Sequence, residues 1–580
     1  MLNVSSALCD LYDFEPRTPV CITYENSDVT TILVLAVIFA GGTVICTYTK
    51  DPYSELLYMA LKVRPKFLFA EAKNLNWAKQ LTRDLGQKVV GVAMDELSKD
   101  DVDETIVYFR KWLEYERTKS RANLPIACDD ISNQIAFVMM SSGTTGKPKA
   151  VPYTHRNCLA DLQLHDRKRL RTSLVCCASF DYVSGRLFQL DAVLGSYNAV
   201  LLNHFEPKAY LEAVEKYKCV AVFLGAAAFY ELITYKHIDD YKLASLKMIF
   251  PMGSKVLYLD ELRAFLEKRP HIEVLRQGFG SSETSGVAMN SLTVDEYFAA
   301  ANNCGKLLPS CRAKIVDPES GRLLDQPNEI GILHVSGPTV FPGYYDVSLR
   351  GAEGSKSALT NNNDEDDKQT HCFDRQCFDA DGFYITGDMA YFDADEQLHL
   401  VGRQKELMVC RAGKKVLPSE LEAVLREHKA VLDVCVLGIA DRNAVGLHCP
   451  RAFIVPQVGC DVEAAAPSHR QIGADRAADE EPPQQEEEEE LQQLSHVGQH
   501  KLCSSLDAQS RRKLAEHLMR FTDNLVGWEK QLTGGIVLLD RIPTSRATGK
   551  HDKNYLRALQ LDSIEIYGDR SGQFEAGGAD

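Results

Sequence analysis

Several features that would place the chain in a membrane, in a disulfide-rich class or on nucleic acid are missing from its sequence. The most apolar stretch, Thr31 to Val44, is shorter than the ~20 residues that a transmembrane helix needs. Lysine and arginine total 65 against 81 acidic residues, a net charge of −16, so we expect no basic surface for nucleic acid. The 17 cysteines include no C-x-x-C pair, which argues against a disulfide framework or a zinc ribbon.

The two ends of the sequence show no targeting signal. Asp10, Asp13 and Glu15 stand where a secretory signal would carry basic residues. The last four residues, Gly577 to Asp580, do not match a peroxisomal tripeptide. Together with the scattered cysteines, this predicts a protein of the reducing cytoplasm, with peripheral membrane association as an alternative.

Length and composition are those of a globular protein with more than one domain. The chain has 580 residues, of which 45% are hydrophobic and 25% are charged. Short apolar runs such as 136–140 and 219–225 alternate with helical patterns as far as residue 393, which predicts an α/β architecture. Within it, we expect Thr31 to Val44 to form a buried helix that turns into a strand at Gly41-Gly42.

The pattern of apolar residues changes after Gly402. It predicts a helix, two strands and a second helix, at 418–428, 431–440, 451–456 and 511–522 respectively. We therefore predict a large domain over 1–402, a small α+β domain over 403–565 and a tail over 566–580.

Two polar segments without hydrophobic periodicity interrupt this order, at about 351–376 and about 461–499. In the second, the run from Asp475 to Glu490 holds nine acidic residues and Arg476, a net charge of −8 and half that of the chain. We expect both segments to be mobile surface insertions. An electrostatic interaction surface is the alternative for the acidic run.

A loop rich in glycine and hydroxyl residues follows the predicted strand at 136–140. It reads Ser141-Ser142-Gly143-Thr144-Thr145-Gly146-Lys147-Pro148-Lys149. Glycines let backbone N–H groups approach anionic oxygens, hydroxyls add donors and lysines add charge, so the loop is suited to hold phosphate. It is not a Walker loop, because Pro148 stands where that motif begins its helix.

With Thr154-His155-Arg156-Asn157, this loop resembles the phosphate-loop signature of the adenylate-forming superfamily. That superfamily contains acyl-CoA synthetases, 4-coumarate–CoA ligases, firefly luciferase and peptide-synthetase adenylation domains. Four further motifs stand in the family's order: Gln277 to Thr284, Tyr384 to Asp388, Gly402 to Glu406 and Pro543 to Lys550.

The resemblance spans roughly residues 20 to 560 and implies a fold. It implies a large N-terminal α/β domain of layered sheets with helices and a small β-barrel part, and a small mobile C-terminal α+β domain. Fewer than 20 residues precede Val20, where relatives have a sizeable region, so we expect the large domain to be N-terminally shortened.

The resemblance also implies the nucleotide site. Glu283 offers a hard oxygen ligand for the Mg²⁺ carried by ATP, Phe279 would stack on adenine, and Asp388 can accept hydrogen bonds from the ribose hydroxyls. Gly253 and Ser254 would form the wall opposite Phe279. The predicted binding set is Ser141, Ser142, Gly143, Thr144, Thr145, Gly146, Lys147, Lys149, Gly253, Ser254, Phe279, Gly280, Ser282, Asp388, Arg403 and Lys550.

Three basic residues are predicted to serve catalysis and domain motion. Lys550 would bridge the attacking carboxylate and the α-phosphate, since two anions must be brought together there. Arg403 can donate to the ribose and to a phosphate. Lys405 matches the family's hinge position. Together with Glu283, the expected metal ligand, Lys550 and Arg403 form the predicted catalytic set.

The acyl site is placed by the resemblance alone. Tyr182 stands where relatives gate the substrate tunnel, with ordinary packing as the alternative. Met252, Val287 and Met289 lie in the expected pocket segments and suggest an apolar acyl or aryl group.

The sequence therefore predicts an acid–thiol ligase that uses ATP and Mg²⁺ to form an acyl-adenylate and passes the acyl group to coenzyme A. An acyl-AMP ligase with another acceptor and an inactive nucleotide-binding paralogue are the alternatives. Light emission is disfavoured, because Val409 stands where luciferase carries a lysine. The expected partners are a carboxylic acid, ATP and coenzyme A, without nucleic acid or a stable membrane span.

Overall fold

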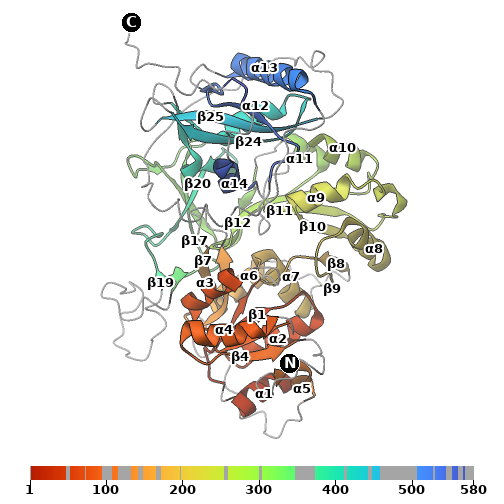
Figure 1. Cartoon of the computed structure of the whole chain (residues 1–580), viewed down its shortest axis with the longest axis vertical. Helices are drawn as coiled ribbons and strands as arrows, with labels where there is room; N and C mark the ends of the chain where they lie inside the picture. Colours follow the sequence, from red (N-terminus) through yellow and green to blue (C-terminus); the bar gives the residue numbers. More distant parts are fainter. Residues whose placement is uncertain are drawn as a thin grey trace. The chain divides into compact units, whose positions relative to one another are not determined.

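In the computed structural model, drawn in Figure 1, the chain forms two compact units. The first comprises residues 1–313 and 335–385, and the second comprises 314–334 and 386–580. The predicted boundary between the large and the small domain, at Arg403, stays a prediction. The structure describes residues 2–12, 14–47, 53–71, 74–94, 107–114, 132–141, 148–164, 172–195, 197–253, 259–299, 303–346, 373–410, 414–441, 447–457, 506–526, 530–543, 551–559 and 566–568.

A seven-stranded sheet forms the N-terminal part of the first unit, in the order β5-β4-β3-β1-β2-β6-β7. Its neighbours are parallel except β6 and β7, which are antiparallel. The strands are β1 (Pro19–Thr23), β2 (Thr43–Cys46), β3 (Phe67–Ala70), β4 (Val90–Ala93), β5 (Val107–Tyr108), β6 (Ile135–Ser141) and β7 (Lys149–Thr154).

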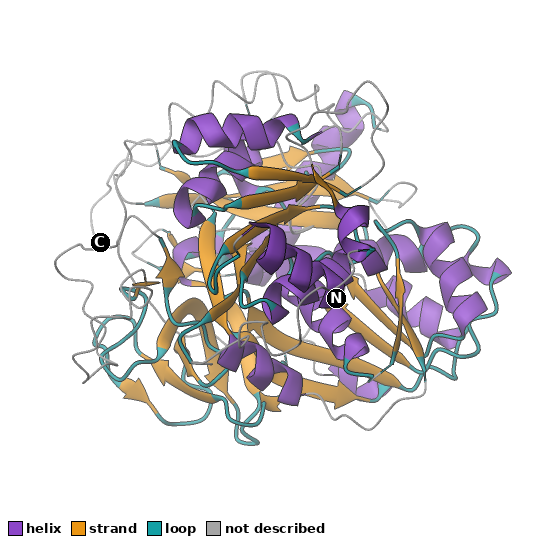
Figure 2. Ribbon diagram, turned by 90° about the horizontal axis from the view of Figure 1, so that it is seen from below, coloured by secondary structure: helices purple, strands orange, loops and turns teal. Residues whose placement is uncertain are grey.

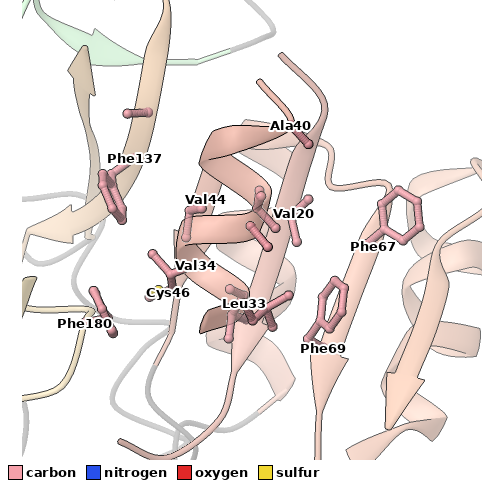
Figure 3. Packing of buried hydrophobic residues seen from close by; sticks show 14 of the residues in the cluster. Val20, Leu33, Val34, Ala40, Val44, Cys46, Phe67, Phe69, Phe137 and Phe180 are labelled. Atoms are coloured by element: carbon pink, nitrogen blue, oxygen red, sulfur yellow. The ribbon is translucent and has the colours of Figure 1, made fainter. Parts of the chain in front are cut away.

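Both faces of this sheet are buried. In β1, Val20 and Ile22 enter one core and Cys21 enters another, because successive side chains of a strand point to opposite faces. The first core is covered by α1 (Leu2–Tyr12), α2 (Asp28–Phe39), α5 (Phe109–Leu113) and α6 (His155–Leu164), and Figure 3 shows its α2 residues. The second is covered by α3 (Tyr53–Val63) and α4 (Asn76–Leu85).

The predicted turn from helix to strand is confirmed. Helix α2 begins after Ser27, whose hydroxyl accepts a 3.0 Å hydrogen bond from the backbone N–H of Thr30. It ends before Gly41, which has a φ of 83° that favours glycine, and β2 starts two residues later.

A five-stranded sheet forms the second part of this unit, in the order β10-β11-β12-β13-β14. Its strands are β10 (Ala221–Gly225), β11 (Met248–Met252), β12 (Val274–Ser281), β13 (Ser285–Leu292) and β14 (Lys306–Leu307). The helices of this part are α7 (Val183–Val193), α8 (Pro207–Tyr217), α9 (Ala226–Ile233), α10 (Leu259–Glu267) and α11 (Val294–Ala299), with the short η4 (Ile238–Asp240).

Two small ribbons complete the first unit. Strands β8 (Ser173–Cys176) and β9 (Asn198–Leu201) are parallel, and β18 (Tyr344–Tyr345) and β19 (Phe373–Asp374) are antiparallel. Strand β19 corrects the predicted end of the first insertion, since Phe373 belongs to the fold through its ring contact with Tyr345. Residues 351–372 of that insertion, and all of the second, lie outside the described residues.

Another five-stranded sheet has the order β16-β15-β17-β20-β21. Its strands are β15 (Arg312–Val316), β16 (Leu323–Leu324), β17 (Gly331–Ser336), β20 (Tyr384–Phe392) and β21 (Leu398–Arg403). The short helix η7 (Gln404–Glu406) and the ribbon of β22 (Met408–Val409) and β23 (Lys415–Val416) follow.

The C-terminal α+β part has the four predicted elements with small changes in their ends, and a further strand and helix that were not predicted. It contains α12 (Pro418–Arg426), β24 (Val431–Ala440), β25 (His448–Pro456), α13 (Ala508–Leu525), β26 (Gly535–Leu538) and α14 (Lys553–Ala558). Strands β24, β25 and β26 form one sheet. Helices α12 and α13 pack on one of its faces, and Leu556 of α14 packs on the other.

The fold class is mixed α/β, as predicted, and Figure 2 shows helices packed beside strands. Within the described ranges, no helix is long and apolar enough to cross a bilayer.

Candidate active site

Strands β6 and β7 form a hairpin whose tip is the predicted phosphate loop. Ser141, the last residue of β6, pairs with Lys149, the first residue of β7. The loop residues between them, from Ser142 to Lys147, lie outside the described part of the chain. The side chain of Ser141 is buried, and its hydroxyl has no hydrogen-bond partner among the residues that the structure describes. A buried hydroxyl at the foot of the loop fits a site that holds a phosphate oxygen.

Glu283 lies in the turn between β12 and β13, and three hydrogen bonds hold the backbone of this turn. The hydroxyl of Tyr153, on β7, donates to the carbonyl of Ser282. The backbone N–H of Phe341 donates to the carbonyl of Glu283 at 2.9 Å. The N–H of Glu283 donates to Oγ of Ser281 at 3.2 Å. The turn is therefore anchored both to the phosphate-loop hairpin and to the segment before β18.

Tyr344 connects Glu283 with Lys149. Its hydroxyl donates to Oε1 of Glu283 at 3.0 Å, and the Nζ of Lys149 lies 4.4 Å from the centre of its ring. Burial, followed by the negative charge of Glu283, raises the pKa of Tyr344, so the hydroxyl keeps its proton and acts as a donor. The hydroxyl of Tyr384 lies 3.4 Å from that of Tyr344.

Sequence reasoning missed Tyr344. The two adjacent tyrosines of β18 must point to opposite faces: Tyr345 is buried in the second core, and Tyr344 is only partly buried against the first. This alternation shows that only one of the pair can face the site, but the choice depends on tertiary packing.

The Thr154 to Asn157 motif has a structural function. The Nδ2 of Asn157 donates to the carbonyls of Pro338 at 2.8 Å and Val340 at 3.0 Å. These residues precede Phe341, whose N–H holds the Glu283 turn. Asn157 therefore supports the candidate metal ligand indirectly.

Strands β12 and β13 approach closely at Gly280. A Cβ atom there would lie 2.2 Å from the carbonyl oxygen of Ser285, so only glycine fits. The neighbouring Phe279 is 8% exposed, which leaves little of its ring accessible in this structure. Adenine stacking by Phe279 stays a prediction.

The predicted gate residue, Tyr182, is the N-cap of α7 and is half-buried. Its N–H donates to the carbonyl of Ser179 at 3.1 Å. A Cβ atom at Gly185 would lie 2.0 Å from the same carbonyl oxygen, so the first turn of α7 packs directly on the preceding backbone. The position of Tyr182 is thus well defined, and its gating role stays a prediction.

Of the two residues of the expected adenine wall, the structure describes only Gly253, and their role stays a prediction. Gly253 follows β11, with a φ of 83°, and is exposed. Ser254 lies outside the described residues.

In the second unit, Asp388 and Arg403 form an ion pair. They are cross-strand partners on β20 and β21, and Nε of Arg403 lies 2.8 Å from Oδ1 of Asp388. Nη1 of Arg403 also donates to the carbonyl of Thr386 at 3.3 Å. The two residues predicted to contact the ribose are therefore brought together, as their assignment to one sugar requires.

Lys405 is exposed in η7, beside Glu406. The carboxylate of Glu406 forms an ion pair of 2.7 Å with Lys553 on α14. The segment at the predicted hinge is therefore tied to the chain just after the predicted catalytic loop.

Lys550 itself lies outside the described residues, but the residues that flank its loop are described. The N–H of Asp552 donates to the carbonyl of Pro543 at 2.8 Å, which closes the base of the loop. Nε2 of His551 lies 2.8 Å from Oδ2 of Asp433 on β24. Lys550 thus directly precedes His551, which this ion pair holds in place.

Comparison with known proteins identifies the family. The family model described as AMP-binding enzyme matches residues 2–345. The 4-coumarate–CoA ligase-like protein 9 of Arabidopsis thaliana is 28% identical over 75% of this chain and 70% of its own. Luciferin 4-monooxygenase of Photuris pensylvanica is 26% identical over 94% of this chain and 86% of its own.

The fold is shared with solved structures. The amide bond synthetase McbA from Marinactinospora thermotolerans matches with a TM-score of 0.69 at 20% identity, over 96% of this chain and 92% of its own. At this identity the likeness concerns the fold. Since the family model covers more than half of the chain, the protein belongs to the family of AMP-binding enzymes.

Proposed function

We propose that this enzyme activates a carboxylic acid with ATP and Mg²⁺ and transfers the acyl group to coenzyme A. In the first step a carboxylate oxygen attacks the α-phosphorus, and the bond to the β-phosphate breaks to release pyrophosphate. In the second step the thiol sulfur attacks the acyl carbon, AMP leaves and the thiol proton is lost to solvent. The observation that carries the proposal is the Glu283 turn, anchored to the phosphate-loop hairpin and linked to Lys149 through Tyr344.

The residues of this site fit Mg²⁺ bound to ATP. Mg²⁺ is usually held by one or two carboxylates together with substrate phosphates, and Glu283 supplies one such carboxylate. Its Oε1 already accepts from Tyr344, which orients the group without neutralising it. The bound metal would supply charge neutralisation at the phosphates.

The other predicted residues take their roles in this scheme as part of the proposal. The hairpin loop and Lys149 bind phosphates, and the pair of Asp388 and Arg403 holds the ribose. Lys550 brings the carboxylate and the α-phosphate together, because a positioned cation offsets their repulsion. The small domain that begins near Arg403 turns at Lys405 between the two steps.

A second candidate is an acyl-AMP ligase with another acceptor. It is favoured by the match to a luciferin 4-monooxygenase over most of both chains. The shared fold of an amide bond synthetase agrees with it. An inactive nucleotide-binding protein is the third candidate, and it would bind ATP without carboxylate-dependent release of pyrophosphate.

The test is product analysis by mass spectrometry. Purified enzyme is incubated with Mg-ATP, coenzyme A and a pooled panel of fatty and aryl carboxylic acids, in parallel with Lys550→Ala and Glu283→Gln. We expect acyl-CoA and AMP from the wild type and a loss of about 10²–10³-fold in rate for Lys550→Ala.

Each other result selects a different function. Acyl-AMP without acyl-CoA would favour another acceptor. ATP binding without any acid-dependent pyrophosphate would favour the inactive protein and overturn the proposal. Equal rates in the wild type and in Lys550→Ala would remove Lys550 from the mechanism.

A further inference from the structure

A fully buried ion pair lies behind the phosphate-loop hairpin. Nη2 of Arg186, on α7, lies 2.8 Å from Oδ2 of Asp161, on α6, and neither side chain is exposed to solvent. Nη1 of Arg186 also donates to Sγ of Cys158 at 3.1 Å. Burial lowers the pKa of Arg186, but Cys158 and Asp161 raise it by more, so the guanidinium stays charged.

The guanidinium lies against both arms of the hairpin. Its central carbon is 3.8 Å from the centre of the Tyr153 ring on β7 and 5.6 Å from that of Phe137 on β6. A planar guanidinium at this distance defines the orientation of the ring that it covers. Arg186 therefore sets the position of Tyr153.

Tyr153 extends this contact to the candidate metal ligand. Its hydroxyl donates to the carbonyl of Ser282, the residue before Glu283. In the other direction, the N–H of Arg186 donates to the carbonyl of Tyr182, the predicted gate, at 3.0 Å. The backbone of Arg186 is thus bonded to the N-cap residue of its own helix, and its guanidinium contacts the hairpin. It reaches the Glu283 turn through the side chain of Tyr153.

Stability alone does not explain a pair of this kind. The cost of removing two charges from water is about as large as their attraction, and replacement of both by apolar residues is often neutral or stabilising. What such a pair does provide is a defined geometry between the elements that carry it.

We propose that Arg186 and Asp161 form a positioning pair that sets the Glu283 turn through Tyr153 and thereby the Mg²⁺-dependent affinity for ATP. The inference rests on the proposed function in one respect, the assignment of Mg²⁺-ATP to Glu283. Neither side chain is exposed to solvent, so both act through Tyr153.

The experiment compares charge-free and hydroxyl-free variants of the full chain. The double variant Arg186→Met, Asp161→Leu removes the pair without leaving a lone buried charge. Tyr153→Phe keeps the ring and removes only the hydroxyl. The control is Arg269→Met, Asp239→Leu, because Arg269 is also buried, lies 4.4 Å from the Phe265 ring and pairs at 2.8 Å with Asp239, which unlike Asp161 is exposed.

ATP affinity is measured by calorimetry with and without Mg²⁺, and thermal unfolding is followed in parallel. We expect the gain in ATP affinity on adding Mg²⁺ to fall about fivefold in the double variant and in Tyr153→Phe, as for the loss of one hydrogen bond. ATP affinity without Mg²⁺ and the unfolding temperature should stay close to those of the wild type. The control should keep the full gain from Mg²⁺.

The remaining outcomes overturn the inference. A full gain from Mg²⁺ in the double variant or in Tyr153→Phe would show that the pair does not act through the hydroxyl. An equal loss in the control would indicate general destabilisation. A wild type whose ATP affinity does not respond to Mg²⁺ would overturn it as well. Failure to form an acyl-adenylate with a normal response to Mg²⁺ would count against the proposed function alone.

Discussion

The hydroxyl of Tyr344 lies 3.0 Å from Oε1 of Glu283, and the ammonium of Lys149 lies 4.4 Å from the centre of the same ring. A single side chain thus contacts the residue that would bind the metal and the lysine at the foot of the phosphate loop. The arrangement orders a carboxylate and an ammonium near each other without a direct ion pair between them, so both charges stay available to a nucleotide.

Removing the Tyr344 hydroxyl should therefore weaken the response to the metal. In Tyr344→Phe the ring still contacts Lys149, but the Glu283 carboxylate loses its donor. We expect acid-dependent pyrophosphate exchange to fall about tenfold at limiting Mg²⁺ and less at saturating Mg²⁺. Tyr297→Phe, in a core cluster of the second sheet, is the control. An unchanged dependence on Mg²⁺ would contradict this role.

The cross-strand pair in the second unit predicts an effect on stability. Asp388 is 6% exposed, so Arg403→Met would leave a nearly buried carboxylate without its cation. We expect the free energy of unfolding to fall by about 1–3 kcal/mol and the affinity for ATP to fall as well. Adding Asp388→Asn should restore stability but not ATP binding. Urea unfolding and calorimetry measure the two effects, and a stable single variant would show that the pair is not important.

The start of α7 should not tolerate a side chain at Gly185. A Cβ atom there would lie 2.0 Å from the carbonyl oxygen of Ser179, so Gly185→Ala must displace the backbone before Tyr182. We expect a loss of stability of about 1–3 kcal/mol and altered selection among acids. At Gly225 a Cβ atom would meet nothing within 4 Å, so Gly225→Ala is the matched control. Thermal unfolding that is equal in the two variants would contradict the packing described.

His428 predicts a dependence of stability on pH. Its Nδ1 accepts from the N–H of Ala430 at 3.1 Å, which places its proton on Nε2, 3.1 Å from Nε2 of His517. Burial, followed by His517, lowers the pKa of His428. The pKa of His428 is therefore lower in the folded than in the unfolded protein. The stability that the neutral imidazole contributes is present above the unfolded pKa and is lost as pH falls through the folded pKa.

Urea unfolding from pH 7.5 down to pH 5 measures this effect. The uptake of one proton changes the free energy of unfolding by at most about 1.4 kcal/mol per pH unit. His428→Leu should flatten the dependence, whereas replacement of the exposed His237 by leucine should leave it unchanged. A wild type whose stability is independent of pH over this range would refute the prediction.

Much of the fold could be predicted because its signals are local. The apolar run of α2 and the glycines after it predicted the helix and the strand β2 in order. The strand at 431–440 matches β24 in both ends, since β-branched residues recur along a largely apolar run. The short strand β19 was missed, because its two residues show no periodicity and depend on pairing with β18.

The candidate site was predictable only in part. Asp388 and Arg403 were assigned to one sugar by their motifs, and they are partners in the structure. Tyr344 stands 61 residues from Glu283, and Arg186 stands 25 residues from Asp161. No local pattern marks either pair, because each contact requires elements that only packing brings together.

The sequence by itself determined the family, the order of most elements and the residues that the motifs carry, since these depend on neighbours in the chain. The tertiary structure decided which tyrosine of β18 faces Glu283 and which arginine is buried against Tyr153. The physical reason is that a hydrogen bond or a buried charge depends on the partner and the burial that folding provides, and residues distant in sequence supply both.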